Sequence, residues 1–307
     1  MNLLEVTHRF QTEDDCLDYI EQMRWPNGKC CVKCGSMNIS QFKRETESKN
    51  RRNRLYQCLE KECGHQFSAT AGTIFADSHL PLTKWFMAIG LIVEAKKGIS
   101  AKQVARHLGM ETSYKTVWYL CHRIREAMKE GGLLDGVVET DETYMTRRKP
   151  RKGKPYVKKD TTDVVLGMIE RGGKLRLIPM KNAKMASIEP AILSHISPDA
   201  TLQTDESAVY SLIGKRYFEG RHHTINHLSS YAIGENHTNS IENAFSLLKR
   251  GVYGTYHTVS LKHLGRYCEE FSFRFNRREE QAQLFDSTLK GLVNGQTVRF
   301  KTLTAAE

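Results

Sequence analysis

The sequence contains no run of about 18 uncharged apolar residues, the length at which a membrane-spanning helix is suspected. Its first residues, MNLLEVTHRFQTEDD, turn acidic at once and include no apolar signal region. Both absences argue against a membrane or secreted protein, so we expect a cytoplasmic chain. The apolar content of 39% suffices for ordinary hydrophobic cores, and 307 residues favour two or three folded units over one.

Acidic residues are in short supply. Asp and Glu number 35 against 46 Lys and Arg, which gives a formal net charge of +11. Such a surplus favours a polyanionic partner, because phosphate contacts supply most of the non-specific affinity of proteins for DNA. A soluble basic protein without such a partner is the alternative, and the charge alone favours nucleic acid over it.

The cysteines are unevenly spread, which argues against a disulfide framework. Five of the 8 cysteines lie between residues 30 and 63. The surrounding segment, residues 29–70, is rich in turns and has too few large apolar residues to form its own core. In a cytoplasmic chain, clustering of this kind points to a metal site.

Two cysteine pairs within this segment have the spacing of zinc knuckles, C-x2-C and C-x4-C, each followed by glycine. They are Cys31, Cys34, Cys58 and Cys63. Four thiolates on two tight turns suit a closed tetrahedral zinc site, which would be structural because no ligand position is left for a substrate. Cys30 is an alternative to Cys31 and His65 an alternative to Cys63, but the spacing favours the four cysteines.

Helical periodicity marks residues 9–25 and three segments within 82–130. Thr12 and Asp15 form a capping arrangement for the first helix. The last two segments follow the helix-turn-helix pattern, since a glycine turn joins a short helix to a longer amphipathic helix. Many helical bundles share that pattern. The outward face of the final helix is expected to carry Tyr114, Lys115, Tyr119, His122 and Arg123. Of these, Lys115 and Arg123 are predicted DNA contacts.

The pattern changes after Gly131 and Gly132, where strands begin to alternate with helices. Predicted strands and helices follow in the order strand-strand-strand-helix-strand-helix-strand-helix, which indicates a mixed α/β sheet with helices on its faces. The predicted domains are residues 1–75, 80–131 and 133–300. Between the first two strands, residues 147–159 form a loop rich in Lys and Arg, either a DNA-backbone contact or a solvated basic loop.

Three acidic residues fall at informative points of this predicted domain. Asp141 and Asp205 are expected at the ends of strands, and Glu242 lies in the helix of HTNSIENAFSLLKRG. Ligands gather at the carboxyl edge of such sheets. Three carboxylates there would repel one another unless cations lay between them, and two Mg²⁺ ions about 3.5–4 Å apart could clamp a phosphodiester. Any one acid taken singly is more commonly an exposed side chain.

The helix of Glu242 also carries basic residues. At about 100° per residue, Lys249 falls within roughly 20° of Glu242, two turns away. A cation on that face could hold the phosphate of the DNA being cut. Lys249 and the adjacent Arg250 are therefore predicted DNA contacts.

Five stretches give the chain a family resemblance that covers most of its length. They are RWPNGKCCVKCGS, YQCLEKECGHQFSATAGTIF, VVETDETY, LQTDESAVY and HTNSIENAFSLLKRGVYGTYHTVSLKHLGRYCEEFSFRFNRR. They resemble bacterial insertion-sequence transposases of the ISXO type. The chain departs from the family at Val32, where a proline is expected, and its second knuckle is two residues longer than C-x2-C. Neither departure removes a ligand.

The resemblance implies a multidomain α+β protein with an N-terminal zinc ribbon, a helix-turn-helix-like segment and a C-terminal RNase H-like DDE domain. It places the first two acids of the site at Asp141 and Asp205. It places the third at Glu242, followed by Lys249. Because some relatives use Asn at the third position, Asn239 is an alternative.

The implied function is metal-dependent transposition in the bacterial cytoplasm, in association with the nucleoid. The implied cofactors are two Mg²⁺ (or Mn²⁺) ions and a structural Zn²⁺. The implied partners are double-stranded DNA, as transposon ends and target, and a second copy of the chain on DNA. Two alternatives remain open: a DNA-binding regulator without catalysis, and a two-metal nuclease that cuts without joining.

Overall fold

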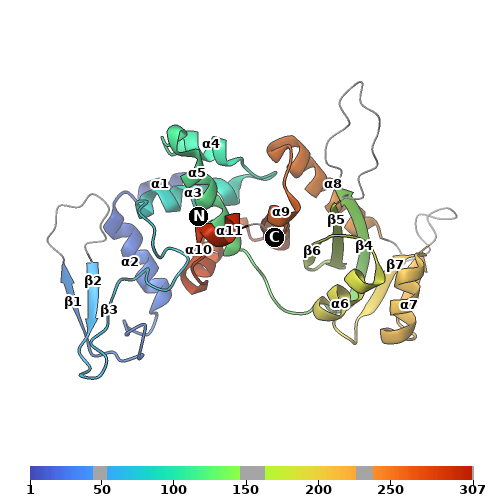
Figure 1. Ribbon diagram of the computed structural model, residues 1–307, viewed down its shortest axis with the longest axis horizontal. Helices are drawn as coiled ribbons and strands as arrows, with labels where there is room; N and C mark the ends of the chain where they lie inside the picture. Colours follow the sequence, from blue (N-terminus) through green and yellow to red (C-terminus); the bar gives the residue numbers. More distant parts are fainter. Residues whose placement is uncertain (44–53, 146–162, 226–237, 306–307) are drawn as a thin grey trace. The chain divides into compact units, whose positions relative to one another are not determined.

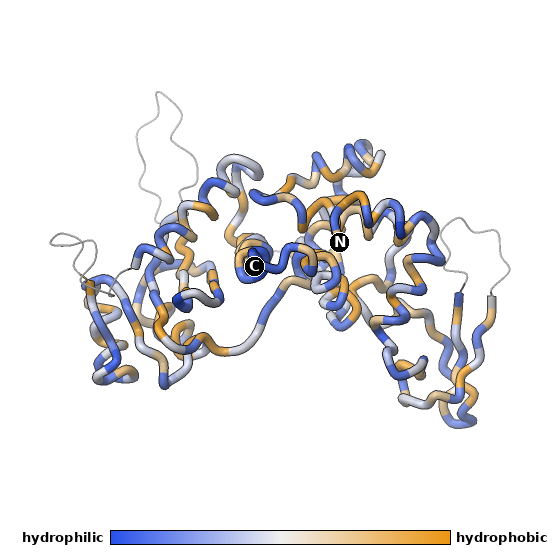
Figure 2. Tube along the Cα trace, turned by 180° about the vertical axis from the view of Figure 1, so that it is seen from behind, coloured by the Kyte–Doolittle hydropathy of each residue, from blue (hydrophilic) through white to orange (hydrophobic). Residues whose placement is uncertain are grey.

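The computed structural model describes residues 1–43, 54–145, 163–225 and 238–305 (Figure 1). The chain divides into two compact units. The first contains Met1–Met128 together with Glu279–Glu307, and the second contains Lys129–Arg278. Hydrophobic and hydrophilic stretches alternate along the helices of both units (Figure 2). Among the described residues, no helix is long and apolar enough to span a membrane.

The first unit combines a small three-stranded sheet with helices. Its sheet has the order β1-β2-β3, and both pairings are antiparallel. Its elements are α1 (Leu3–Arg9), α2 (Glu13–Arg24), β1 (Ile39–Lys43), β2 (Arg54–Cys58), β3 (Gln66–Phe67), α3 (Leu82–Glu94), α4 (Ala101–His107), η1 (Glu111–Ser113), α5 (Tyr114–Glu126), η3 (Gln281–Gln283), α10 (Leu284–Asn294) and α11 (Phe300–Thr304).

Two helices of this unit begin at side-chain caps, and the first of these is the cap that the sequence indicated. The Oγ1 atom of Thr12 accepts a hydrogen bond from the amide of Asp15 at 3.1 Å, and the Asp15 carboxylate accepts one from the amide of Thr12 at 2.8 Å. The Ser100 hydroxyl likewise accepts a hydrogen bond from the amide of Gln103 at 3.2 Å. Each cap satisfies amide groups that the first helical turn leaves unpaired.

A buried acid joins the small sheet to α2. Glu21 is 5% exposed, and its carboxylate accepts a hydrogen bond from the Tyr56 hydroxyl on β2 at 2.6 Å. Lys29 forms an ion pair with the same carboxylate at 2.9 Å. The rings of Trp25 and Phe67 pack against that of Tyr56. The small sheet is therefore held against a helix and does not depend on a core of its own.

Helix α10 completes the helical core of the first unit. Its side chains Phe285, Leu289 and Leu292 are buried, and the helix packs against α2, α3 and α5. Gly291 permits this approach, because a Cβ at that position would clash with the carbonyl oxygen of Ala127. A larger residue at 291 would have to push α10 away from the end of α5.

This arrangement differs from the domain boundaries taken from the sequence. The predicted catalytic domain extends to residue 300, whereas Glu279–Glu307 belong to the first unit. Residues 1–75 and 80–131, predicted as separate domains, lie in one compact unit. The amphipathic pattern of α10 shows which of its faces is buried, but it does not show which core buries it.

The second unit is a mixed α/β domain built on five strands. Strands β4 and β5 pair antiparallel, as do β5 and β6, while β7 is parallel to both β4 and β8. The strand order is β6-β5-β4-β7-β8, so the first strand of the unit is central and the second runs against the others. This is the predicted RNase H-like arrangement. Its elements are β4 (Val137–Met145), β5 (Asp163–Glu170), β6 (Leu175–Met180), α6 (Met185–His195), β7 (Thr201–Asp205), α7 (Ala208–Tyr217), β8 (His222–Ile225), α8 (Asn239–Gly251), the π-helical η2 (Val252–Tyr256) and α9 (Leu261–Asn276).

Helices cover both faces of this sheet. One apolar cluster joins the strands to α6 and α7, with Ile188, Ile192 and Ile213 among its buried residues. A second cluster joins the opposite face to α8 and α9, with Phe245 and Leu264 among its buried residues. Alternation of side chains along β4 therefore sends even-numbered residues such as Val138 to the first face and odd-numbered residues to the second.

Candidate functional site

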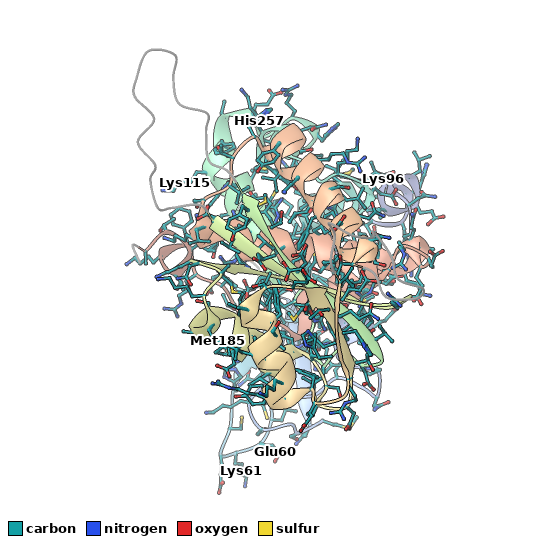
Figure 3. All side chains as sticks on the ribbon, turned by 90° about the vertical axis from the view of Figure 1, so that its right-hand side faces the viewer. Glu60, Lys61, Lys96, Lys115, Met185 and His257 are labelled. Atoms are coloured by element: carbon teal, nitrogen blue, oxygen red, sulfur yellow. The ribbon has the colours of Figure 1, made fainter. Side chains whose placement is uncertain are left out.

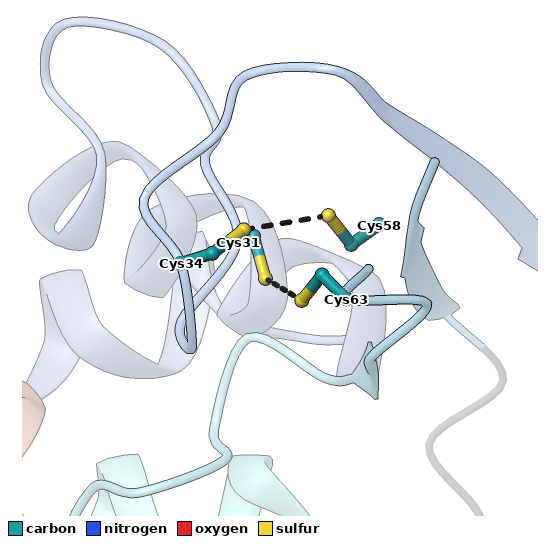
Figure 4. A group of neighbouring side chains, drawn as sticks. All are labelled: Cys31, Cys34, Cys58 and Cys63. Carbon is teal, nitrogen blue, oxygen red and sulfur yellow. Dashed lines mark hydrogen bonds between the residues drawn. The ribbon is translucent and has the colours of Figure 1, made fainter. Parts of the chain in front are cut away.

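The four predicted cysteine ligands come together at one end of the small sheet (Figure 4). Their sulfur atoms all lie within 4.8 Å of one another. The sulfurs of Cys31 and Cys63 are 3.8 Å apart, and those of Cys34 and Cys58 are 3.5 Å apart. A regular tetrahedron with Zn–S bonds of about 2.3 Å has sulfurs about 3.8 Å apart. The spacing therefore fits a zinc ion.

Local backbone geometry prepares these turns for a metal. Gly35 and Gly64 follow the two cysteine pairs with φ angles of 77° and 51°, a region that favours glycine. Although burial raises the pKa of Cys31, hydrogen bonds from backbone amides, including that of Lys33, lower it to about 7. Cys30 and His65 lie outside the group of four. The donor set is that of a closed structural zinc site.

In the second unit, strand register brings two of the predicted acids to the same level. Glu139 on β4 pairs with Gln203 on the parallel strand β7. Two residues further along each strand, Asp141 and Asp205 therefore lie side by side on the same face. Both are partly buried. Their positions follow from a short parallel pairing between strands 64 residues apart (205 − 141).

The structure corrects one detail of the sequence analysis, which placed Asp141 at the end of its strand. Strand β4 continues to Met145, paired with β5 up to Asp163. Asp205 does end β7, and its carboxylate accepts a hydrogen bond from the amide of Ser207 at 3.0 Å. Asp141 lies beyond the last residue of β4 that pairs with β7, because β7 is shorter than β4 and β5.

Glu242 lies in the first turn of α8, on the face of the sheet that carries the two aspartates. Burial raises the pKa of Asp141 to about 7, with further contributions from the charges of Glu142, Asp205 and Glu242. The charges of both other predicted acids therefore act on the pKa of Asp141. Within the described part of the chain, only the four cysteines form a group of three or more ligand atoms that all lie within 4.8 Å of one another, so at least one pair among the three carboxylates is farther apart than that.

Two acids near this site were not singled out from the sequence. Burial, together with the charge of Asp205, raises the pKa of Glu142, whose carboxylate accepts a hydrogen bond from the buried Tyr210 at 2.5 Å. Glu139 is fully buried and contacts the start of α8. The alternation of side chains along VVETDETY places Glu139 on the same face as Asp141. It does not show that the start of α8 is the partner of Glu139.

Helix α8 also carries the predicted third-position alternative and two predicted DNA contacts. Asn239 is exposed at the first position of the helix, and Arg250 is exposed in the last turn. The Arg250 guanidinium donates a hydrogen bond to the Ser246 hydroxyl at 3.0 Å. Lys249 is partly exposed, two turns beyond Glu242. The last turn of α8, which carries the basic residues, is thus accessible to solvent, two turns from Glu242.

In the first unit, the structure overturns Arg123 as a predicted DNA contact. Arg123 is 2% exposed, and its guanidinium donates hydrogen bonds to the carbonyl oxygens of Ile74 and Ala76, the second at 2.6 Å. It also lies over the rings of Trp85 and Tyr119. The helical pattern of α5 could not show that a distant loop covers this face. His122, expected on the same outward face, is fully buried too.

Lys115, the other predicted contact on α5, is exposed (Figure 3). Its ammonium group lies 4.6 Å from the centre of the Phe300 ring on α11. Phe300 also packs against Trp118 and Tyr119. Part of the face expected to point outward is therefore covered by the C-terminal segment. The basic loop at residues 147–159 lies outside the described residues.

Comparison with known proteins adds family information to this geometry. The chain matches the ISXO2-like transposase domain over residues 133–276 and the transposase zinc-ribbon domain over residues 11–66. It is 25% identical over 281 residues to a Halobacterium salinarum protein named as an uncharacterized protein in transposable element ISH50, covering 86% of this chain and 91% of the relative.

A second relative is an uncharacterized transposase-like protein of Haemophilus influenzae, 30% identical over 125 residues, covering 41% of this chain and 98% of the relative. No solved structure matches this chain. The two domain matches fall on the two sites described above, the cysteine cluster and the acid-bearing sheet. With its cysteine cluster and its RNase H-like sheet, the chain belongs to the ISXO2-like transposases, which combine a zinc ribbon with a DDE domain.

Proposed function

We propose that this transposase binds the terminal inverted repeats of its element and catalyses metal-dependent strand cleavage followed by strand transfer. Asp141, Asp205 and Glu242 are the proposed catalytic carboxylates. The observation that carries this proposal is the register of β4 and β7, which brings Asp141 and Asp205 to the same level on the face of the sheet that α8 covers.

The chemistry of these residues fits two divalent cations. Burial and the charges of Glu142, Asp205 and Glu242 raise the pKa of Asp141, so the site has an excess of negative charge that bound cations would relieve. Oxygen ligands of this kind suit Mg²⁺ or Mn²⁺. When bound, such ions supply charge neutralisation and acidify a nucleophilic oxygen. The carboxylates themselves orient the site and fix where the phosphodiester can lie.

Basic side chains are proposed to hold the DNA. Lys249 and Arg250 form the accessible end of α8, and a cation on the helix that carries Glu242 could contact the phosphates next to the one that is cut. On the first unit, Lys115 remains a proposed contact. Handling two transposon ends in one reaction implies two copies of the chain on DNA. The net charge of +11 supports a nucleic-acid partner.

The decisive test is an assay with end-containing oligonucleotides, Mg²⁺ and a plasmid target. Joined products that disappear in Asp141→Asn would support the proposal. Asp199→Asn is the matched control, because Asp199 is an exposed acid of the same unit that precedes β7, whereas Asp205 ends that strand. Cleavage without joining would favour a nuclease, and end binding without either reaction would favour a regulator.

A further inference from the structure

Glu139 is a buried carboxylate next to the catalytic acids that plays no part in the proposed chemistry. It lies on β4 two residues before Asp141 and therefore on the same face of the sheet. Its side chain is fully buried. Carboxylates are almost never fully buried unless they are paired, because an isolated charge is costly to remove from water. Its partners therefore indicate its role.

The first partner of Glu139 is the start of helix α8. One carboxylate oxygen accepts hydrogen bonds from the amides of Ser240 at 2.9 Å and Ile241 at 3.2 Å. The other accepts the Ser240 hydroxyl at 3.0 Å. The N-cap residue Thr238 provides no side-chain cap. The strand thus caps the helix, with a negative charge at the positive end of its dipole.

The second partner is Arg171, at the turn between β5 and β6. Its Nε atom lies 3.2 Å from the Glu139 carboxylate, and a terminal nitrogen donates a hydrogen bond to the Gln203 side chain at 2.7 Å. Gln203 is the register partner of Glu139 on β7. The guanidinium therefore links the residues that stand two positions before Asp141 and Asp205 on their strands.

These contacts connect the elements that carry the three acids. Asp141 is on β4, Asp205 is on β7 and Glu242 is on α8, one residue after Ile241. We propose that Glu139 is a positioning residue that sets the spacing of the three metal-binding carboxylates by holding α8 and β7 to β4. This inference rests on the proposed function, since it assumes that those acids bind the metal.

A purely structural role predicts something different. If Glu139 only stabilised the fold, its replacement would lower stability without a specific effect on metal affinity in protein that remains folded. If it positions the acids, metal affinity and cleavage should fall together. Outer partners of metal ligands commonly contribute about 10–100-fold to affinity or activity.

The test is titration of the full-length protein with Mn²⁺ alone by calorimetry, alongside oligonucleotide cleavage, after circular dichroism has confirmed folding. Glu139→Gln keeps the shape but loses the charge and places an amide against the helix amides. We expect a Mn²⁺ dissociation constant about 10–100-fold higher, and slower cleavage that higher Mn²⁺ concentrations partly restore. Unchanged affinity and cleavage in the folded variant would overturn the proposal.

Two controls separate positioning from stability. Thr140→Val changes the next residue, which is fully buried and belongs to the opposite face, and should leave Mn²⁺ affinity unchanged. Ile192→Val removes a methylene group from the core on that opposite face. An equal loss of Mn²⁺ affinity in Ile192→Val would show that general destabilisation explains the result and would overturn the proposal.

A milder variant keeps the test decisive if Glu139→Gln does not fold. Ser240→Ala removes only the hydroxyl that contacts Glu139 and leaves the backbone cap in place. It should weaken Mn²⁺ binding in the same direction by a smaller factor, and wild-type affinity in this variant would overturn the inference. Failure of the proposed function looks different, because Asp141→Asn would then retain cleavage whatever happened at Glu139.

Discussion

Gly167 on β5 lies directly beneath the ring of Phe245 on α8. A Cβ at Gly167 would lie 2.6 Å from Cε1 of Phe245 and 2.5 Å from Cδ1 of Ile241. Gly167 is also the register partner of Asp141. The absence of a side chain therefore lets the helix of Glu242 approach the sheet at the level of Asp141, the first of the proposed catalytic acids.

We expect Gly167→Ala to displace α8, because both nearby side chains belong to a packed core that has little room to adjust. Overpacking of this kind commonly costs about 1–3 kcal/mol of unfolding free energy. Cleavage should fall with it, since Glu242 moves with the helix. Chemical denaturation and an end-cleavage assay would measure both effects.

The matched control is Gly265→Ala on α9. A Cβ there would meet only Cγ of Pro179 at 3.7 Å, an ordinary contact. This variant should be neutral or slightly more stable, because alanine favours helices over glycine by about 1 kcal/mol. If Gly167→Ala behaved like Gly265→Ala, close packing would not be what holds α8 at the sheet.

His222 should make the second unit sensitive to mild acid. Burial lowers the pKa of His222 below 6.5, with a second contribution from His223. The unfolded chain then binds a proton more readily than the folded one. The free energy of unfolding is therefore undiminished above pH 6.5, and it falls as the pH drops from there through the folded pKa. Denaturation midpoints between pH 7.5 and 5.5 should show the loss, and His222→Gln should reduce it.

His223→Gln is the control on the same strand. His223 is exposed, and its charge is the smaller cause of the shift at His222, so most of the pH dependence should persist without it. Equal flattening of the pH profile in both variants would contradict burial as the main cause. The measurement requires metal-free buffer, so that binding at the acidic site does not contribute.

Zinc should be needed for the ribbon but not for the second unit. Cys58→Ser removes one of four thiolates, and we expect it to abolish stoichiometric zinc and to unfold the segment around β1–β3. Hydrogen exchange should become fast there while the strands of the second unit stay protected. Cys30→Ser is the matched control, because Cys30 lies outside the group of four; loss of zinc in this variant would contradict the ligand assignment.

Substitutions at Arg123 and Lys115 should have different effects, the first on stability and the second on DNA binding. Arg123→Met leaves the carbonyls of Ile74 and Ala76 without their donor, which should cost about 1–3 kcal/mol of unfolding free energy. Lys115→Gln loses only an exposed cation over the Phe300 ring, which should cost at most about 0.5–1 kcal/mol. It should reduce the salt dependence of DNA affinity by about one phosphate contact. Fluorescence anisotropy at several salt concentrations measures this slope. An unchanged slope would remove Lys115 from the interface.

The sequence was most informative where structure depends on neighbouring residues. Cysteine spacing identified the four residues that come together, since each knuckle is a local turn. The cap of Thr12 and Asp15 fixed the start of α2 for the same reason. The expectation for the acids held only in part, because Asp205 ends β7 while β4 continues past Asp141 to Met145.

Long-range contacts account for what the sequence missed. Arg123 looked exposed on a helical projection, but residues 74 and 76 cover it. Residues up to 300 were expected in the catalytic domain, but the apolar face of Leu284–Asn294 completes the other unit. Glu139 could be placed on the face of Asp141, but its partner Ser240 lies 101 residues further along the chain.

The third carboxylate is decided by comparing Glu242 with Asn239. The charge of Glu242 acts on Asp141, whereas a neutral amide at Asn239 contributes no such charge. We therefore expect Glu242→Gln to reduce cleavage by at least about 100-fold, as loss of a precisely placed charge does, and Asn239→Ala to change it little. Both residues are exposed on the first turn of α8, so neither variant should disturb folding. Loss of activity in Asn239→Ala with retention in Glu242→Gln would move the third ligand to Asn239, one turn earlier on the same helix.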